Sequence, residues 1–298
     1  MRTTNHIFRN AAVAWLGVLL TISMSMAETA PFAVQVSGKG PAMILIPGLS
    51  CGGNVWDGTV AHFKDHYECH VLTLAGFGGQ PAIDGPFLDP VRAAIIKYIA
   101  DKKLNHPVII GHSLGGMLSY WIAATAPDAV GPVIAVDGLP FYSALINPAA
   151  TGESMKEMAG RYRGQLASQP HDQFVSANRA FLQAMITSPE DLDRVAALSQ
   201  NSDPKTVGTA FYELMTLDLR PQLKSIKSPV LLLGAAAMGT DAGMQATFEA
   251  AYRAQLTNAP NHKVVFVPGA KHFIQLDQPK AFYAEVEKFL KDSATAQH

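Results

Sequence analysis

Six short apolar runs, separated by stretches of helical periodicity, constrain the fold of this chain more than any other sequence feature. The runs are rich in Val, Ile and Leu, and they occupy residues 42–46, 69–74, 107–111, 132–136, 229–233 and 263–267. Near-continuous apolar strands that alternate with helices are typical of a parallel sheet covered on both faces. The sequence therefore predicts an α/β fold with a mostly parallel, twisted sheet. Residues 32–36, ahead of the Gly38-Lys39-Gly40 turn, predict an additional antiparallel strand at one edge.

Start signals place helices between the strands. Asp89-Pro90 predicts a helix to about Lys103, because Asp accepts hydrogen bonds from the free amides of a first turn and Pro is tolerated there. Residues 114–126 predict the helix after the third of these runs. Gln278-Pro279 begins a last helix, which we expect to end near Lys291.

The alternation stops over residues 139–227, which have no strand signal. Three sequences in this stretch are typical of capped helix N-termini, and they begin at Thr151, Ser188 and Asp203. We therefore expect a helical insertion at residues 139–227 between two parts of one core, residues 28–138 and 228–298.

The larger apolar side chains of the insertion recur at helical spacing. They are Met155, Met158, Phe174, Phe181, Met185, Phe211 and Met215. Two interpretations stay open. The insertion is either a packing subdomain or a lid over an active site, and in the second case some of these side chains line an apolar substrate pocket.

Residues 1–27 have the three-part layout of a secretory signal peptide. Arg2 and Arg9 flank a polar start, residues 11–22 are almost wholly apolar, and Ser25-Met26-Ala27 puts small residues before the expected cleavage site. The alternative is a membrane anchor, but this apolar run is well short of the roughly 20 residues that span a bilayer. We expect export to the periplasm or the medium, with no stable membrane association after cleavage.

Charge and cysteine content indicate whether nucleic acid, disulfides or a metal are to be expected. The net charge is −1, and the 23 Lys and Arg residues are scattered, so we expect no nucleic-acid partner. The two cysteines, Cys51 and Cys69, fall near opposite ends of neighbouring predicted strands, which predicts two free thiols. No His, Cys or Asp cluster has ligand spacing, so neither a metal nor another cofactor is expected.

The sequence Gly111-His112-Ser113-Leu114-Gly115 follows a predicted strand and precedes a predicted helix. In this setting G-x-S-x-G forms a sharp turn that raises a serine hydroxyl above the sheet edge, and Cβ atoms at the glycines would clash with neighbouring strands. Ser113 is thus the candidate nucleophile. His112 fills the variable position, where we expect it to pack or form a local hydrogen bond.

With these residues the chain resembles the α/β-hydrolase superfamily, and the resemblance covers essentially all of residues 32–290. Further matching segments are Leu45-Ile46-Pro47-Gly48-Leu49 with Trp56, Gly76-Phe77-Gly78, Asp218-Leu219-Arg220-Pro221 and Gly269-Ala270-Lys271-His272-Phe273. The resemblance implies an α/β-hydrolase fold with a helical lid, and a triad in the order Ser, acid, His.

His272 is the candidate general base, because it lies in the loop between the last strand and the last helix, where the family holds its histidine. A serine hydroxyl needs a nearby imidazole to take its proton. We expect the remaining histidines, His70 among them, to lie on the surface. The oxyanion hole should come from the backbone amides of Leu49 and Leu114, with Ser50 as a weaker candidate. Pro47 stands where most of the superfamily has His.

The acid of the triad stays open between three residues. The family usually places it soon after the strand that ends at Gly234, but three alanines follow there and the first carboxylate is Asp241. Asp137 ends the preceding strand, where some branches of the fold carry the acid, and we favour it. Asp218 is the third candidate, although it fits better as an anchor for the return of the insertion to the core.

These residues predict a serine hydrolase that cleaves a carboxylic ester or a related acyl bond of a small, apolar substrate through an acyl-enzyme. Lactones, thioesters and amides would use the same groups. One alternative keeps the triad for a cofactor-independent lyase, a perhydrolase or a C–C hydrolase. The other is a binding protein without catalysis.

Overall fold

The computed structural model describes residues 30–236 and 242–295. The predicted signal peptide and Asp241 lie outside these residues. All the predicted strands and the whole of residues 139–227 are described, so these predicted elements can be compared with the observed ones.

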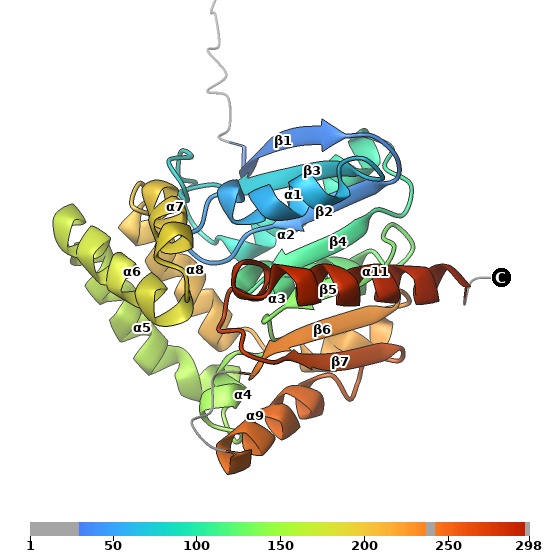
Figure 1. Ribbon diagram of the computed structural model, residues 1–298. Helices are drawn as coiled ribbons and strands as arrows, with labels where there is room; N and C mark the ends of the chain where they lie inside the picture. The colour runs from blue at the N-terminus through green and yellow to red at the C-terminus, as the bar shows by residue number, and fades with distance from the viewer. Residues whose placement is uncertain (1–29, 237–241, 296–298) are drawn as a thin grey trace, which may run out of the picture.

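Seven strands form one sheet in the order β1-β3-β2-β4-β5-β6-β7 (Figure 1). The strands are β1 Phe32–Gly38, β2 Ala42–Ile46, β3 Glu68–Leu74, β4 Val108–His112, β5 Val133–Val136, β6 Val230–Ala235 and β7 His262–Val267. β1 pairs antiparallel with β3, and every other neighbouring pair is parallel. The predicted mostly parallel sheet with an antiparallel edge strand is therefore confirmed.

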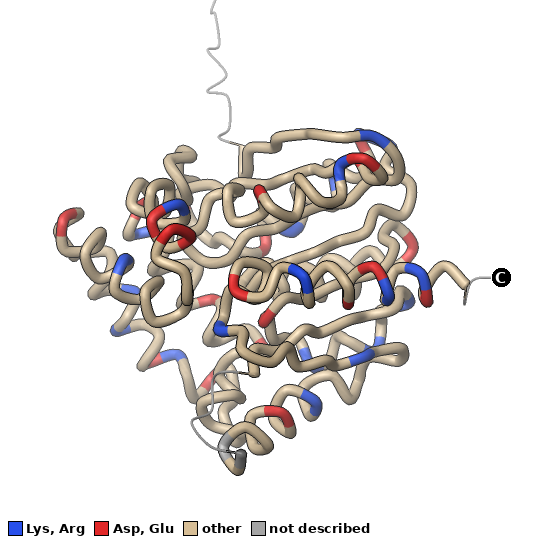
Figure 2. The backbone as a smooth tube through the Cα atoms, in the orientation of Figure 1, with Lys and Arg blue, Asp and Glu red and all other residues tan. Residues whose placement is uncertain are grey.

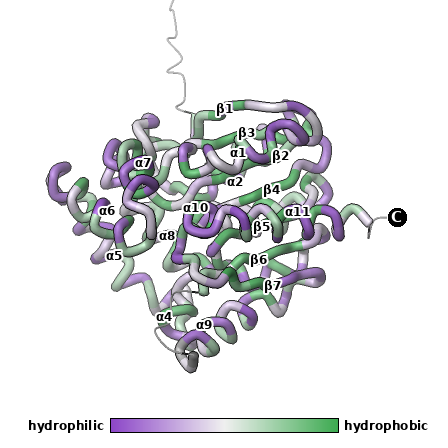
Figure 3. The backbone as a smooth tube through the Cα atoms, in the orientation of Figure 1, coloured by the Kyte–Doolittle hydropathy of each residue, from purple (hydrophilic) through white to green (hydrophobic). Residues whose placement is uncertain are grey.

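Helices cover both faces of the sheet, and each face has its own apolar cluster. One face packs against α2 Leu88–Asp101, α3 Leu114–Thr125 and α9 Ala242–Gln255, and the other against α1 Asp57–Phe63 and α11 Pro279–Thr295. The strands are the most hydrophobic segments of the core in Figure 3, as burial on both faces requires. The short helix α10 Ile274–Asp277 follows the loop that carries His272.

Five helices lie between β5 and β6, in the stretch where the sequence predicts an insertion. They are α4 Ser143–Ile146, α5 Gly152–Ser168, α6 His171–Met185, α7 Pro189–Ser199 and α8 Pro204–Thr216. Thr151, Ser188 and Asp203 cap α5, α7 and α8 with their side chains, as the sequence predicts. Figure 1 shows α5 to α8 gathered at one end of the sheet.

Two local predictions are wrong. Asp89 does not cap α2, because the helix begins one residue earlier and Asp89 pairs with Arg92 inside the first turn. Glu213 of α8 accepts hydrogen bonds from the amides of Phe87 and Leu88 instead. His70 is buried rather than exposed, since it lies on an inner strand and its ring contacts Tyr98 and Glu68.

The placement of the two cysteines agrees with the prediction of free thiols. Positive and negative residues are interspersed along the chain in Figure 2. Cys51 and Cys69 are free and buried. Of the helices in residues 30–236 and 242–295, none has the length and apolar character needed to cross a membrane.

Candidate active site

Ser113 stands at a strained turn between β4 and α3. Its backbone has φ 54° and ψ −118°, a conformation that a non-glycine residue holds only when its surroundings impose it. A Cβ at Gly111 would lie 2.1 Å from the carbonyl oxygen of Gly115, and a Cβ at Gly115 would lie 2.3 Å from that of Ile46. The two glycines are therefore needed for the chain to turn this sharply and present the serine hydroxyl.

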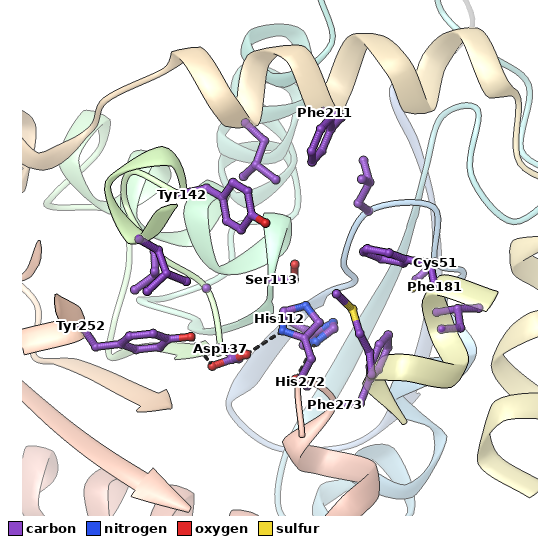
Figure 4. Close-up of a pocket in the computed structure, with 17 residues that line it drawn as sticks. Cys51, His112, Ser113, Asp137, Tyr142, Phe181, Phe211, Tyr252, His272 and Phe273 are labelled. Carbon is purple, nitrogen blue, oxygen red and sulfur yellow. Dashed lines mark hydrogen bonds and ion pairs between the residues drawn. The ribbon is translucent and has the colours of Figure 1, made fainter. Parts of the chain in front are cut away.

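His272 and Asp137 form a close pair at the carboxyl ends of β7 and β5. His272 Nδ1 lies 2.6 Å from Asp137 Oδ2, and the Asp137 side chain is buried (Figure 4). Asp137 has φ 49°, and its amide donates to the carbonyl of Leu233 on β6. The backbone thus fixes the carboxylate at the edge of the sheet, facing the imidazole.

Of the two acid candidates that the structure describes, Asp137 contacts His272 and Asp218 does not. Asp218 is engaged elsewhere, because both its oxygens bind the Arg220 guanidinium at the start of the segment that returns to β6. That placement fits its predicted role as an anchor. Asp241 lies in the part of the chain that is not described.

His112 contacts the loop that carries His272. Its Nε2 donates to the carbonyl oxygen of His272 at 3.1 Å, and the two rings lie 4.6 Å apart. Burial, and then the neighbouring His272, hold the pKa of His112 well below its usual value, so this imidazole stays neutral. His112 thus packs against its neighbours as expected, but its hydrogen bond joins it to a loop 160 positions away rather than to a local partner.

Ser113 and His272 line the same cavity, and Figure 4 shows the serine hydroxyl and the imidazole facing it. No hydrogen bond joins the two side chains in the described structure. In enzymes without bound substrate the serine-to-histidine contact is often long and tightens only when substrate binds, so this geometry is compatible with proton transfer.

Leu49, in the loop after β2, lines the cavity together with Ser113, and Leu114 follows Ser113 directly as the first residue of α3. Within the described residues neither amide donates to a protein acceptor, which leaves both able to bind a substrate oxygen. Ser50, the next residue of the β2 loop, has φ 60° and is buried. Its hydroxyl contacts Ser199 of α7, and its carbonyl accepts from Ser202, so the insertion contacts this loop directly.

The cavity beside Ser113 has a volume of about 150 Å³ and a largely apolar wall. Three of the seven predicted apolar positions of the insertion line it: Phe181, Met185 and Phe211. Phe181 also has 51% of its surface exposed, which places it at the opening. Met155, Phe174 and Met215 are buried in apolar clusters instead. The insertion therefore both packs on itself and forms a wall of the site.

The profile of the alpha/beta hydrolase family matches residues 43–286, which include the Gly111–Gly115 turn with Ser113, the insertion and His272. The chain belongs to the alpha/beta hydrolase family. Solved alpha/beta hydrolase structures share its fold. An enol-lactonase from Burkholderia xenovorans LB400 has a TM-score of 0.70 at 17% identity, over 87% of this chain and 96% of that one. A bromoperoxidase from Bacillus anthracis has a TM-score of 0.72 at 17% identity, over 87% and 95%.

Curated relatives of this alpha/beta hydrolase include esterases and a lactonase. A pimeloyl-[acyl-carrier protein] methyl ester esterase from Aliivibrio salmonicida is 27% identical over 203 residues, which are 66% of this chain and 74% of the relative. The 3-oxoadipate enol-lactonase 2 from Acinetobacter baylyi is 25% identical over 257 residues, or 84% and 89% of the two chains. Both names describe hydrolysis of an ester bond, open-chain or cyclic.

Asp137 of this alpha/beta hydrolase makes two further contacts, which the sequence does not predict. Tyr252 of α9 donates its hydroxyl to Asp137 Oδ1 at 2.9 Å, and the amide of Ala235 donates to the same oxygen at 2.9 Å. Burial, followed by the Asp137 charge, raises the pKa of Tyr252, so the phenol remains a donor. No motif surrounds Tyr252, and the helical periodicity of α9 marks it only as a buried position.

The described residues hold no group of three or more His, Cys, Asp and Glu side chains arranged to bind a metal ion.

Proposed function

We propose that this alpha/beta hydrolase is a serine hydrolase that cleaves a carboxylic ester or a related acyl bond. The observation that carries the proposal is the 2.6 Å contact between His272 Nδ1 and buried Asp137, beside a cavity that Ser113 also lines. A carboxylate in this position fixes the imidazole tautomer, with the proton on Nδ1 and the lone pair of Nε2 free to accept the serine proton.

The proposed reaction has two halves. Ser113 Oγ forms a bond to the substrate carbonyl carbon while its proton passes to His272 Nε2, and the oxyanion accepts hydrogen bonds from the amides of Leu49 and Leu114. The carbonyl re-forms as the bond to the leaving alkoxide breaks, and His272 gives the proton to that alkoxide. Water then attacks the acyl-serine through the same groups, which releases the acid and restores Ser113.

Asp137 stays ionised through both halves in this mechanism. It orients His272 and stabilises the imidazolium that forms transiently, and it does not take the proton. Its hydrogen bonds from Tyr252 and the Ala235 amide hold the Asp137 side chain in place facing His272. Esterase and lactonase names among the relatives support ester hydrolysis as the reaction class.

A fluorophosphonate probe and a p-nitrophenyl ester test the proposal together. The wild-type protein should be labelled on Ser113 and should release p-nitrophenol, and Ser113→Ala should lose both signals. Asp137→Asn should lower kcat by about 10⁴-fold, because the wrong histidine tautomer is then favoured. Asp241→Asn is the matched carboxylate control and should retain most of the activity.

The outcomes separate the alternative functions. Labelling of Ser113 without turnover of any ester, lactone or amide would favour a lyase, perhydrolase or C–C hydrolase on the same groups. Absence of labelling would favour a binding protein without catalysis. Loss of activity in Asp241→Asn rather than Asp137→Asn would overturn the assignment of the acid.

We also propose that the insertion acts as a lid and that the enzyme is exported. The side chains of α6 and α8 that line the cavity support a lid role for the insertion, since they shield Ser113 from water on that side. The layout of residues 1–27 supports export with cleavage after Ala27.

A further inference from the structure

The cavity beside Ser113 is small for a ligand site. Its volume is about 150 Å³. An apolar cavity of about 150 Å³ holds one benzene molecule, whereas sites for drug-sized ligands measure roughly 300–1,000 Å³. The space beside Ser113 therefore holds about six non-hydrogen atoms of a substrate.

The cavity wall offers no positive side chain that could pair with a substrate anion. Among its described lining residues, the one carboxylate is that of Asp137, which is hydrogen-bonded to His272. Neither Lys nor Arg lines the cavity, and the sequence of residues 237–241 contains neither. Lys271 lines a separate groove along α6 and α7. A substrate carboxylate would therefore lie unpaired near the Asp137 carboxylate, and burying an unpaired charge is costly.

One neutral hydrogen-bond donor of the wall remains available to a substrate. Tyr142, at the start of the insertion, points its hydroxyl into the cavity towards Ser113 (Figure 4). The other tyrosine of the wall, Tyr252, is engaged with Asp137, whereas Tyr142 has no hydrogen-bond partner among the described residues. Burial raises the pKa of Tyr142, so its phenol stays protonated and able to donate.

We propose that the cavity selects a compact, uncharged acyl group that carries a second oxygen, in an open chain or in a lactone ring, and that Tyr142 donates a hydrogen bond to this oxygen. The inference rests on the proposed function of Ser113. It assigns a specificity role to a residue that takes no part in the proton transfers. It also excludes dicarboxylic monoesters as good substrates.

The charge requirement is tested with two methyl esters of the same shape, methyl 4-methylpentanoate and monomethyl succinate, by measuring methanol release. The terminal isopropyl and carboxylate groups match in size, so the comparison isolates the charge. We expect kcat/KM to be at least about 100-fold lower for the succinate monoester, because its carboxylate loses water without gaining a partner. Equal values for the two esters would overturn the inference.

The Tyr142 contact is tested with methyl methoxyacetate and methyl butyrate, in which an ether oxygen replaces a methylene group. The preference for methoxyacetate should fall about fivefold in Tyr142→Phe, the effect of one neutral hydrogen bond of about 1 kcal/mol. Intrinsic reactivities cancel, because the same two esters are compared in both proteins. Tyr283→Phe, on α11 and outside the cavity wall, is the matched control and should keep the wild-type preference. An unchanged preference in Tyr142→Phe would refute the contact.

The two proposals fail in different ways. If no ester is hydrolysed in a Ser113-dependent manner, the proposed function is wrong. If the neutral esters are hydrolysed but the succinate monoester is hydrolysed equally well, or Tyr142→Phe keeps its preference, the proposed function stands and the substrate inference is wrong.

Discussion

His112 is a buried imidazole that the proposed reaction does not use, and its environment gives it a measurable effect on stability. It donates from Nε2 to the His272 carbonyl, while its Nδ1 has no partner among the described residues. Protonation would add a charge in a fully buried position beside His272, which is why the pKa of His112 is well below the usual value in the folded state.

This depression predicts a pH dependence of folding. Above about pH 6.5 His112 is neutral in both the folded and the unfolded chain, so its contribution to the unfolding free energy is constant. Below that pH the unfolded chain binds a proton that the folded chain does not, so the unfolding free energy should fall by up to about 1.4 kcal/mol per pH unit. Urea unfolding between pH 7.5 and pH 5 measures this slope.

His112→Gln is the variant for comparison, because its amide can still donate to the His272 carbonyl but does not titrate. It should show a shallower slope over the same pH range, whatever its stability at neutral pH. His70, whose pKa burial also lowers, contributes equally to both proteins. Identical slopes in the two proteins would mean that His112 is protonated in the folded state.

At the level of single residues, the sequence predicts those functional groups that have a fixed place in a motif. Ser113 follows from the glycines around it, and His272 follows from its place after the last strand. The sequence favours Asp137 as the acid but does not exclude the other candidates, because its contact with His272 joins positions 135 residues apart. The sequence does not predict a role for Tyr252 or Tyr142 for the same reason, since only the tertiary fold brings their hydroxyls to the site.

At the level of helices and loops, the contact between α7 and the β2 loop connects the insertion to the proposed oxyanion hole. Ser199, at the end of α7, is buried and bonded to both Ser50 of the loop and Asn178 of α6. Ser50 holds a left-handed backbone conformation, which costs of order 1–3 kcal/mol and persists only where the surroundings impose it. We therefore expect the insertion to influence the direction of the adjacent Leu49 amide.

Replacing Ser199 with Ala should therefore affect the chemical step. We expect kcat to fall by roughly tenfold with little change in KM, because a displaced oxyanion donor weakens binding of the transition state more than that of the substrate. Ser168→Ala, an exposed serine of α5 that bonds only its own helix, is the control and should leave kcat unchanged. A lower melting temperature in Ser199→Ala with normal kcat would instead indicate a purely structural role.

The helices also show where local sequence signals suffice. Thr151, Ser188 and Asp203 cap helices a few residues away, so the sequence predicts these starts. Asp89 led to a wrong prediction of the α2 cap. The amides at the start of α2 donate instead to Glu213, which is more than a hundred residues distant in the chain. A cap supplied by another element leaves no local pattern.

At the level of the whole molecule, the sheet places Ser113, Asp137 and His272 together because each follows the carboxyl end of a parallel strand. β4, β5 and β7 are neighbours or near neighbours in the sheet order, so their following loops meet at one edge. Apolar strands and their order of appearance are sufficient to predict this edge. The volume and polarity of the cavity are not predictable in this way, since they depend on how the insertion packs over it.

The N-terminal segment lies outside the described residues, and its sequence predicts export. We expect the chain, produced in a bacterium with residues 1–27 intact, to be recovered from the periplasm or the medium with Glu28 as its first residue. Cell fractionation followed by N-terminal sequencing measures both properties. Leu19→Arg should block export, because a charge in the apolar run opposes insertion, whereas Thr4→Ala in the polar start should not. Recovery of the full-length chain from the membrane would favour the anchor interpretation, and recovery of it from the cytosol would refute export.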